Sequence, residues 1–195
     1  MDYSFNIAYP DDHSIVISNI TNEHMNDIPE LSSNITRLVI SHDYIDHYSI
    51  PQGIDTATLT YLGLKTLYVP DGVKYLYCCH NFLRKLELPS SIVHVIANNN
   101  LLTEVTFRGF PKDLYYLDIR TNRICYLDIP ISKSLEYLNA AFNPCVQELC
   151  NENSISTEVQ EYLRSQHIPH IYSESDDDDN WADHLYSNFG RILQN

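Results

Sequence analysis

The chain has 195 residues, 44% of them apolar, and a formal net charge of −14 at neutral pH. This length and composition are typical of one domain with a sizeable core. Residues 1–150 carry 17 acidic and 10 basic side chains, and residues 151–195 carry 9 and 2. Such a balance argues against nucleic-acid binding, because Lys and Arg supply most of the affinity for a phosphate backbone. We therefore expect a protein partner, and the acidic balance favours a basic one.

The sequence also bears on the cellular compartment. The first 18 residues lack a basic start followed by an apolar run, and no apolar stretch is long enough to cross a bilayer. We therefore expect a cytoplasmic or nuclear protein without membrane contact. The five cysteines mostly occupy positions expected to face inward, so we interpret them as reduced thiols. They are Cys78, Cys79, Cys125, Cys145 and Cys150.

Residues 1–34 are predicted to form an N-terminal cap. The segments FNIAY (5–9) and SIVIS (14–18) are rich in β-prone residues and flank a polar turn, PDDH, at residues 10–13. A β-hairpin at this place would cover the open end of the first repeat.

Residues 35–150 repeat one pattern about six times. The clearest copy, VKYLYCCHNFLRKLELP at residues 73–89, has Asn81 between two apolar groups and a proline at its end. The pattern is L-x-x-L-x-L-x-x-N-x-L-x-x-L-x-L-P. A proline precedes each opening residue, in most copies by three positions. The copies open at Ile35, Ile54, Val73, Ile92, Leu114 and Leu135, in steps of 19, 19, 19, 22 and 21 residues.

The L-x-L part of each copy is predicted to be a short strand in a parallel sheet, with its leucine-type residues facing the core. The asparagine that follows can hydrogen-bond backbone groups in a turn, and stacked copies can form a ladder. Asp43 can replace it partly in the first copy, and Leu62 replaces it in the second. The recurrent proline and the short step leave no room for a full α-helix, so we expect an extended or irregular return side. The predicted ladder residues are Asn81, Asn100, Asn122 and Asn143.

Over roughly residues 29–150, this P-x-x-L phase and short period resemble the leucine-rich repeats of bacterial type III effectors, and similar repeats occur in some large DNA viruses. The resemblance implies an α/β leucine-rich-repeat solenoid with short parallel strands on one face. Several such effectors append a ubiquitin-ligase domain, but the 45 residues after Cys150 are too few for it, so ligase activity is not implied. Effectors built of repeats alone act by binding host proteins, and the resemblance extends to these.

After the repeats, residues 151–172 are predicted to form a helical C-terminal cap, with Thr157 and Gln160 as a capping box. Residues 173–180, SESDDDDN, have the composition of a solvated acidic linker. Apolar spacing resumes at residue 181, and this amphipathic tail either binds a partner or folds back on the solenoid. Its apolar positions are Trp181, Leu185, Phe189 and Ile192.

The outward face of the predicted sheet is the strongest candidate binding site. Strand side chains alternate, so the residues on either side of the second leucine-type position point away from the core. With strands about 4.8 Å apart, they form two columns rich in tyrosine, which supplies both apolar area and a hydroxyl at interfaces. The alternative is that tyrosine is frequent here only because it suits strands. The predicted partner-binding residues are Arg37, Tyr75, Tyr77, His94, Ile96, Tyr116, Asp118, Tyr137 and Asn139.

No catalytic site, metal site or cofactor is predicted. The stretch HDYIDH at residues 42–47 and the pair His167 and His170 do not supply four ligands at zinc spacing. Cys79 and His80 are adjacent, so their side chains would point to opposite faces of a strand and would not form a nucleophile and base pair. The chain has no glycine-rich phosphate loop.

The sequence therefore favours a noncatalytic scaffold, a pathogen or viral factor that binds a host protein through its aromatic face and inhibits or redirects it. Two alternatives stay open. The first is an acidic-tailed regulator of basic nuclear or cytoplasmic proteins, similar in layout to the acidic leucine-rich nuclear phosphoproteins. The second is an adaptor that recruits cellular machinery through the tail. Deletion of residues 173–195 separates the scaffold, which would keep its partner, from the acidic-tailed regulator, which would lose it.

Overall fold

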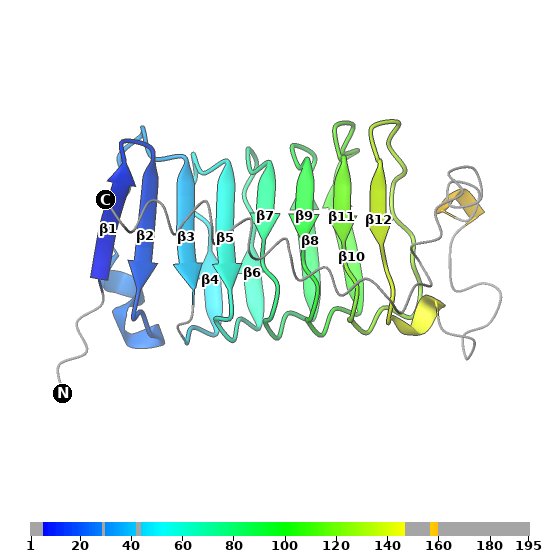
Figure 1. Ribbon diagram of the computed structural model, residues 1–195, viewed down its shortest axis with the longest axis horizontal. Helices are drawn as coiled ribbons and strands as arrows, with labels where there is room; N and C mark the ends of the chain where they lie inside the picture. The colour runs from blue at the N-terminus through cyan, green and yellow to red at the C-terminus, as the bar shows by residue number, and fades with distance from the viewer. Residues whose placement is uncertain (1–5, 29, 42–43, 147–156, 160–195) are drawn as a thin grey trace.

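The computed structural model of the protein is a parallel β-solenoid of about six turns with little helix (Figure 1). The structure describes residues 6–28, 30–41, 44–146 and 157–159. Successive turns stack along the long axis of the molecule, and each contributes one strand to a single large sheet. The prediction of a solenoid with short parallel strands on one face is confirmed.

The large sheet has eight strands in the order β1-β2-β3-β5-β7-β9-β11-β12, so neighbouring strands come from neighbouring turns. Burial alternates along them as predicted: in β7, Leu76 is buried, whereas Tyr75 and Tyr77 point outward. All pairs except β1 with β2 are parallel. The parallel strands are β2 (Ser14–Ser18), β3 (Arg37–Ser41), β5 (Thr56–Thr60), β7 (Tyr75–Tyr77), β9 (His94–Ile96), β11 (Tyr116–Asp118) and β12 (Tyr137–Asn139).

The N-terminal end adds one parallel strand, β2, to the six that the repeat pattern predicted. β1 (Asn6–Asp11) pairs antiparallel with β2, which gives a hairpin at this end of the sheet. β2 also pairs parallel with β3, so that Ile15 lies beside Leu38. The sequence predicted β2 as one arm of the hairpin but not as a strand of the parallel sheet, because its turn has Ile20 at the position of the ladder asparagine. The role of this region as a cap stays a prediction.

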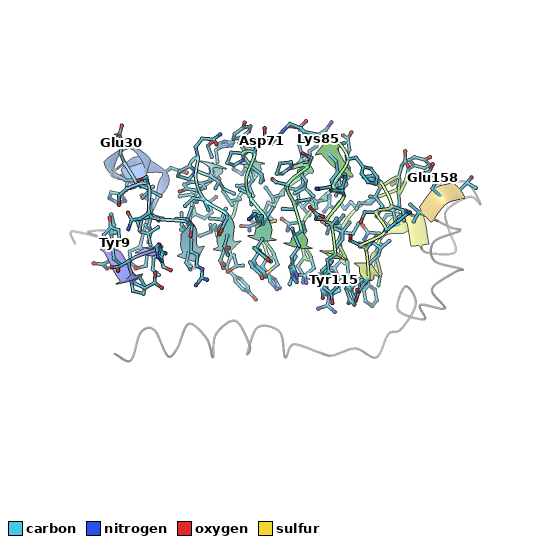
Figure 2. All side chains as sticks on the ribbon, turned by 90° about the horizontal axis from the view of Figure 1, so that it is seen from above. Tyr9, Glu30, Asp71, Lys85, Tyr115 and Glu158 are labelled. Carbon is cyan, nitrogen blue, oxygen red and sulfur yellow. The ribbon has the colours of Figure 1, made fainter. Side chains whose placement is uncertain are left out.

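The return side of the solenoid consists of short parallel strands in two separate pairs, which confirms the predicted extended return side. In Figure 2 the molecule is seen from above, and Lys85 of the return layer lies on the opposite side from Tyr115, which precedes β11. Two 3-10 helices complete the named elements, η1 (Asn22–Asp27) and η2 (Pro144–Val146). The pairs are β4 (His47–Ser49) with β6 (Thr66–Tyr68), and β8 (Lys85–Pro89) with β10 (Glu104–Arg108).

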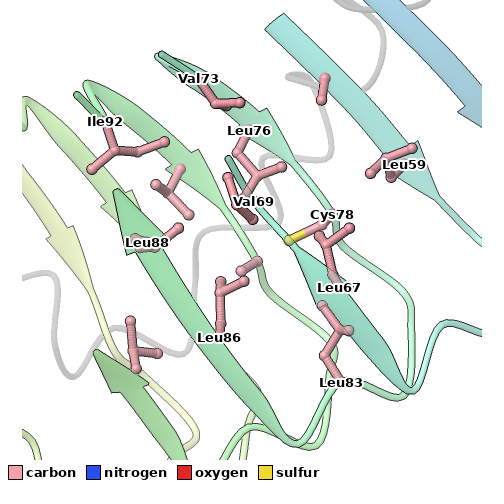
Figure 3. Packing of buried hydrophobic residues seen from close by; sticks show 14 of the residues in the cluster. Leu59, Leu67, Val69, Val73, Leu76, Cys78, Leu83, Leu86, Leu88 and Ile92 are labelled. Atoms are coloured by element: carbon pink, nitrogen blue, oxygen red, sulfur yellow. The ribbon is translucent and has the colours of Figure 1, made fainter. Parts of the chain in front are cut away.

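The core fills the space between the two layers (Figure 3). The turn that opens at Val73 buries Leu76 from the large sheet and Leu86 from the return layer almost completely. Full burial of such a side chain contributes ~1.5–3 kcal/mol. Cys78 occupies an equivalent inward position, and burial raises the pKa of its thiol, so it acts as the small apolar side chain that was predicted. Among the described cysteines, Cys78, Cys79 and Cys125 are free thiols.

A ladder of buried asparagines joins successive turns where the chain leaves the large sheet. Asn122 is representative: its Nδ2 donates to the carbonyl oxygens of Ala97 at 3.0 Å and Ile119 at 3.0 Å. Its Oδ1 accepts a hydrogen bond from the backbone N–H of Leu102 at 2.9 Å. The side chain therefore bonds two turns at once, which satisfies backbone groups that would otherwise be buried unpaired. All four predicted ladder residues do this, namely Asn81, Asn100, Asn122 and Asn143; Asp43 lies outside the described residues.

The residue before each ladder position has a positive φ. Bulky or β-branched residues rarely adopt this left-handed region, and a strained backbone of this kind costs ~1–3 kcal/mol where the surroundings enforce it. Here the ladder bonds the backbone on both sides of the corner, which holds the conformation. The described corner residues have φ between 53° and 59°, and they are Asn19, Tyr61, His80, Asn99, Thr121 and Phe142.

The two longer steps of the repeat do not disturb the strand register. Tyr116 lies beside His94 and Tyr137 lies beside Tyr116, as in a strict repeat. In the first longer step the chain passes through Gly109, which has a φ of 92°, before β11 begins. The extra residues enter the turn between the return layer and the sheet, because the inward leucines and the ladder fix the strands on either side.

Little of the predicted C-terminal region is described. Residues 157–159 are helical, and Val159 packs on the hydrophobic core. The rest of the predicted helical cap lies outside the described residues, as do the acidic linker and the tail positions Trp181, Leu185, Phe189 and Ile192. These predictions stay predictions.

Candidate functional site

Five aromatic side chains lie together on the outer face of the large sheet, and we call them the aromatic strip. The strand register places Tyr75 beside His94, His94 beside Tyr116, and Tyr116 beside Tyr137. Tyr77 lies two residues further along β7 and also contacts His94. The alignment that the repeat frame predicted is therefore present. The aromatic strip consists of Tyr75, Tyr77, His94, Tyr116 and Tyr137.

The rings of the aromatic strip stack along the solenoid axis. The ring centroids of His94 and Tyr116 are 4.3 Å apart with planes 3° from parallel, and those of Tyr116 and Tyr137 are 4.1 Å apart at 3°. Tyr75 and Tyr77 approach His94 with tilted rings at 6.5 Å and 5.4 Å. Such pairs contribute ~0.5–1.5 kcal/mol beyond their area burial. Tyr116 is therefore held by a neighbouring ring on each side.

The central ring of the aromatic strip is a neutral imidazole. Burial lowers the pKa of His94 to about 4, and its Nε2 atom is buried without a hydrogen-bond partner among the described residues. Burial likewise raises the pKa of the Tyr77 and Tyr116 phenols. The Tyr137 hydroxyl accepts a hydrogen bond from Asn139 Nδ2 at 3.1 Å. Near neutral pH the strip is thus a row of uncharged rings, edged by phenol hydroxyls.

The second predicted column is correctly placed but less exposed than expected. Ile96, Asp118 and Asn139 point outward in register with Tyr77, yet only 4%, 3% and 7% of their surfaces are accessible. The Asp118 carboxylate accepts hydrogen bonds from Asn98 Nδ2 at 3.1 Å and from the backbone N–H of Arg120 at 3.0 Å. Burial raises the pKa of Asp118. These three side chains lie buried beside the aromatic strip and expose little surface to a partner.

Arg37 lies apart from the aromatic strip. It is on β3, and the register places Thr56 of β5 between it and Tyr75. Two strand spacings of about 4.8 Å separate Arg37 from the first ring. The predicted residues therefore form one aromatic group and one remote cation. Between them, β5 presents the hydroxyl side chains of Thr56, Thr58 and Thr60.

A second aromatic group, which the sequence analysis did not single out, lies at the corners that follow the large sheet. Tyr61 and His80 stack with ring centroids 4.3 Å apart and planes 6° from parallel. Tyr44 and Phe82 directly follow the asparagine position of their turns and are more than half exposed, and the Tyr44 ring lies close to Gly63 of the next turn. The available signal was the recurrence of aromatic residues directly beside the asparagine position, where the scaffold does not need them.

The return side has one open groove of note. Its volume is about 430 Å³, and it lies between β10, the end strand of its pair, and residues 124–129. Its lining mixes the ion pair of Lys85 and Glu104, 2.8 Å apart, with Val105, Tyr126 and Leu127. This mixed, open groove contains no arrangement of groups suited to catalysis.

The candidate reactive groups give no site within the described part of the chain. Cys79 is buried and its pKa is raised to about 12 by that burial, which opposes formation of a thiolate nucleophile. Three or more side chains able to hold a metal ion do not come together among the described residues. His42, His167 and His170 lie outside those residues.

No protein-family model and no curated protein matches the chain. No helix in the described ranges is long and apolar enough to span a membrane. The fold and the site together define a parallel β-solenoid with a row of stacked, neutral aromatic rings on its sheet face.

Proposed function

We propose that the repeats are leucine-rich repeats of the short-period type found in bacterial type III effectors and some large DNA viruses. Three observations support this assignment: the 19-residue step, the buried asparagine ladder and the extended return side. Longer leucine-rich repeats use the extra residues of each turn for a helix on the return side.

The function that we propose is noncatalytic binding of a protein partner through the aromatic strip. The observation that carries the proposal is the continuous row formed by Tyr75, His94, Tyr116 and Tyr137, each in register with the next. Tyrosine is a frequent anchor at protein interfaces, and the open sheet face of a solenoid is its usual binding surface. The fold does not require these rings, because Arg37 and Thr56 occupy the same column in other turns.

The chemistry of the strip favours a protein over other ligands. The faces of the inner rings cover one another, so they are not free to stack on nucleobases. The same face lacks the cluster of cations that a phosphate backbone requires. We place the protein in the cytoplasm or nucleus of a host cell, as a pathogen or viral factor that blocks or redirects the protein it binds.

The test compares three versions of the full chain in affinity purification from cell extract: wild type, Tyr77→Ala/Tyr116→Ala, and Tyr126→Ala. Tyr126 is a matched control because it is an exposed tyrosine on the return side. Captured proteins are identified, purified and titrated against each version. We expect the double variant to bind the partner at least about tenfold more weakly, or about 1.4 kcal/mol, while the control binds normally. Equal binding by all three versions would refute the proposal.

A further inference from the structure

The aromatic face has little charge although the chain as a whole is strongly acidic. By sequence, the seven parallel strands contain only two charged residues, Arg37 and Asp118. Arg37 is remote from the rings, and Asp118 is buried with Arg120 Nε 3.4 Å from its Oδ2. A partner on the strip therefore meets no unpaired carboxylate from these strands.

Charged pairs lie instead on the return layer and its edges. Lys85 Nζ is 2.8 Å from Glu104, and Arg108 is 3.0 Å from Glu87. Lys65 Nζ lies 3.0 Å from Asp46 at the start of the return side. These ion pairs lie away from the aromatic strip, although the exposed Lys74 and Glu136 directly precede β7 and β12.

The way the rings stack also limits what they can recognise. A cation–π contact or a stacked sugar needs an open ring face, but Tyr116 is covered on one side by His94 and on the other by Tyr137. What remains open to a partner is the row of ring edges and hydroxyls, continued on β5 by the half-buried Thr56, whereas Thr58 and Thr60 are buried. Such a surface forms apolar contacts and neutral hydrogen bonds.

A charged partner would lose free energy on this surface. Lys or Arg side chains placed against the rings would be desolvated without a carboxylate to pair with, and an unpaired buried charge is strongly unfavourable. Apolar side chains and neutral donors or acceptors avoid that cost and match the ring edges and hydroxyls.

Building on the proposed function, we propose that the aromatic strip binds an uncharged segment of a protein partner, and that the acidic character of the chain takes no part in this contact. The segment carries apolar side chains for the ring edges and neutral hydrogen-bonding groups for the tyrosine hydroxyls and for the half-buried Thr56. Binding is therefore nearly independent of salt. This differs from the basic partner that overall composition favours.

The experiment selects binders from a displayed library of random peptides on the full-length protein, and counter-selects on Tyr77→Ala/Tyr116→Ala. Selected peptides are synthesised, and their Kd values are measured at low and high salt. We expect peptides of near-zero net charge, with Kd values that change less than about threefold with salt. We also expect binding at least about tenfold weaker to the double variant than to wild type or Tyr126→Ala.

A second variant, Tyr116→Phe/Tyr137→Phe, keeps the rings and removes two hydroxyls, so the test does not depend on the alanine variant being folded. We expect it to bind the same peptides several-fold more weakly than wild type, by about the net contribution of one or two hydrogen bonds. Unchanged binding by this variant would overturn the role of the hydroxyls.

The outcomes separate this inference from the proposed function. Strip-dependent peptides rich in Lys and Arg, with affinity that falls steeply with salt, would overturn the inference and leave the proposed function standing. Peptides that bind the double variant as well as wild type, or a selection that yields no strip-dependent peptide, would overturn both.

Discussion

The two layers of this solenoid share one core but differ on their outer surfaces. The sheet layer is a continuous eight-stranded sheet whose outer face carries stacked neutral rings. The return layer is divided into two pairs of strands and carries exposed ion pairs such as Lys85 with Glu104. Exposed ion pairs contribute ~0–1 kcal/mol to folding stability, so substitutions on the return surface should change that stability little. This difference indicates that the inward side chains of both layers determine the fold. The outward side chains of the sheet layer, which include the aromatic strip, are available for binding.

The largest loss of stability is expected from substitutions in the core, and it tests whether the two layers share that core. Leu76 on β7 and Leu86 on β8 are both almost completely buried, one from each layer. Leu76→Ala and Leu86→Ala should each lower the free energy of unfolding by ~2–5 kcal/mol, because each leaves a cavity in a packed core. Urea denaturation measures both. A small loss at one position with a large loss at the other would show that the two layers are not equally packed.

The next-largest loss of stability is expected at the asparagine ladder, which joins successive turns. Asn122→Ala removes hydrogen bonds to the carbonyls of Ala97 and Ile119 and to the N–H of Leu102. The buried backbone groups that are left cost ~1–3 kcal/mol, and we expect a loss of that size in the unfolding free energy. Lys85→Ala, on the exposed return face, is the control and should stay within ~0.5 kcal/mol of wild type. Equal stability of the two variants would contradict the structural role of the ladder.

A smaller loss of stability is expected when one tyrosine of the aromatic strip is removed, and a tyrosine of the return side serves as the comparison. Tyr116→Ala loses stacking on both His94 and Tyr137, whereas Tyr126→Ala removes a side chain that is 56% exposed. We expect a destabilisation of ~1–2 kcal/mol for the first and under about 0.5 kcal/mol for the second, measured by chemical denaturation. If the two variants were equally stable, the rings would not support one another as their geometry indicates.

The last effect is pH-dependent and belongs to the aromatic strip alone. The folded state lowers the pKa of His94 from 6.5 to about 4, so between these values the unfolded chain binds more protons. The contribution of His94 to stability should therefore fall as the pH drops from about 6.5 to about 4. The groups that face the imidazole are the phenols of Tyr75, Tyr77 and Tyr116, and burial raises the pKa of the last two further above this range.

The measurement is the difference in unfolding free energy between wild type and His94→Gln as a function of pH. Taking this difference cancels the contributions of other titrating groups to the pH dependence. One of them is Asp118, whose raised pKa changes stability in the opposite direction. A difference that is flat across the window would contradict the buried, neutral imidazole.

Much of the fold could be predicted because the repeat places the same side chain at the same inward position in each turn. Leu76, Val95 and Leu117 lie side by side as the frame requires, and Asn81 and Asn100 bond the neighbouring turns. Strand β2 was predicted as one arm of a hairpin but not as a strand of the parallel sheet, because its turn lacks the asparagine, although Ile15 and Ile17 occupy the inward positions. The repeat pattern identifies a turn by its asparagine, whereas a strand joins the sheet whenever its inward residues are apolar.

The candidate site could be predicted only as columns of residues. Alternation gave the outward direction of Asp118 and Asn139, but their burial depends on how larger neighbours lean over them, which periodicity does not encode. Ring stacking likewise follows from the rotamers of Tyr116 and Tyr137. The corner pair Tyr61 and His80 was missed because it lies outside the strand alternation on which the prediction relied.

Site-specific photo-crosslinking tests the central claim most directly. A benzoylphenylalanine replaces Tyr75, which is 39% exposed at one end of the aromatic strip, or Tyr126 on the return side, and each protein is irradiated in cell extract. If the sheet face binds the partner, a discrete adduct should form from position 75 and not from position 126. An adduct from position 126 alone would contradict the account and place the binding surface on the return layer.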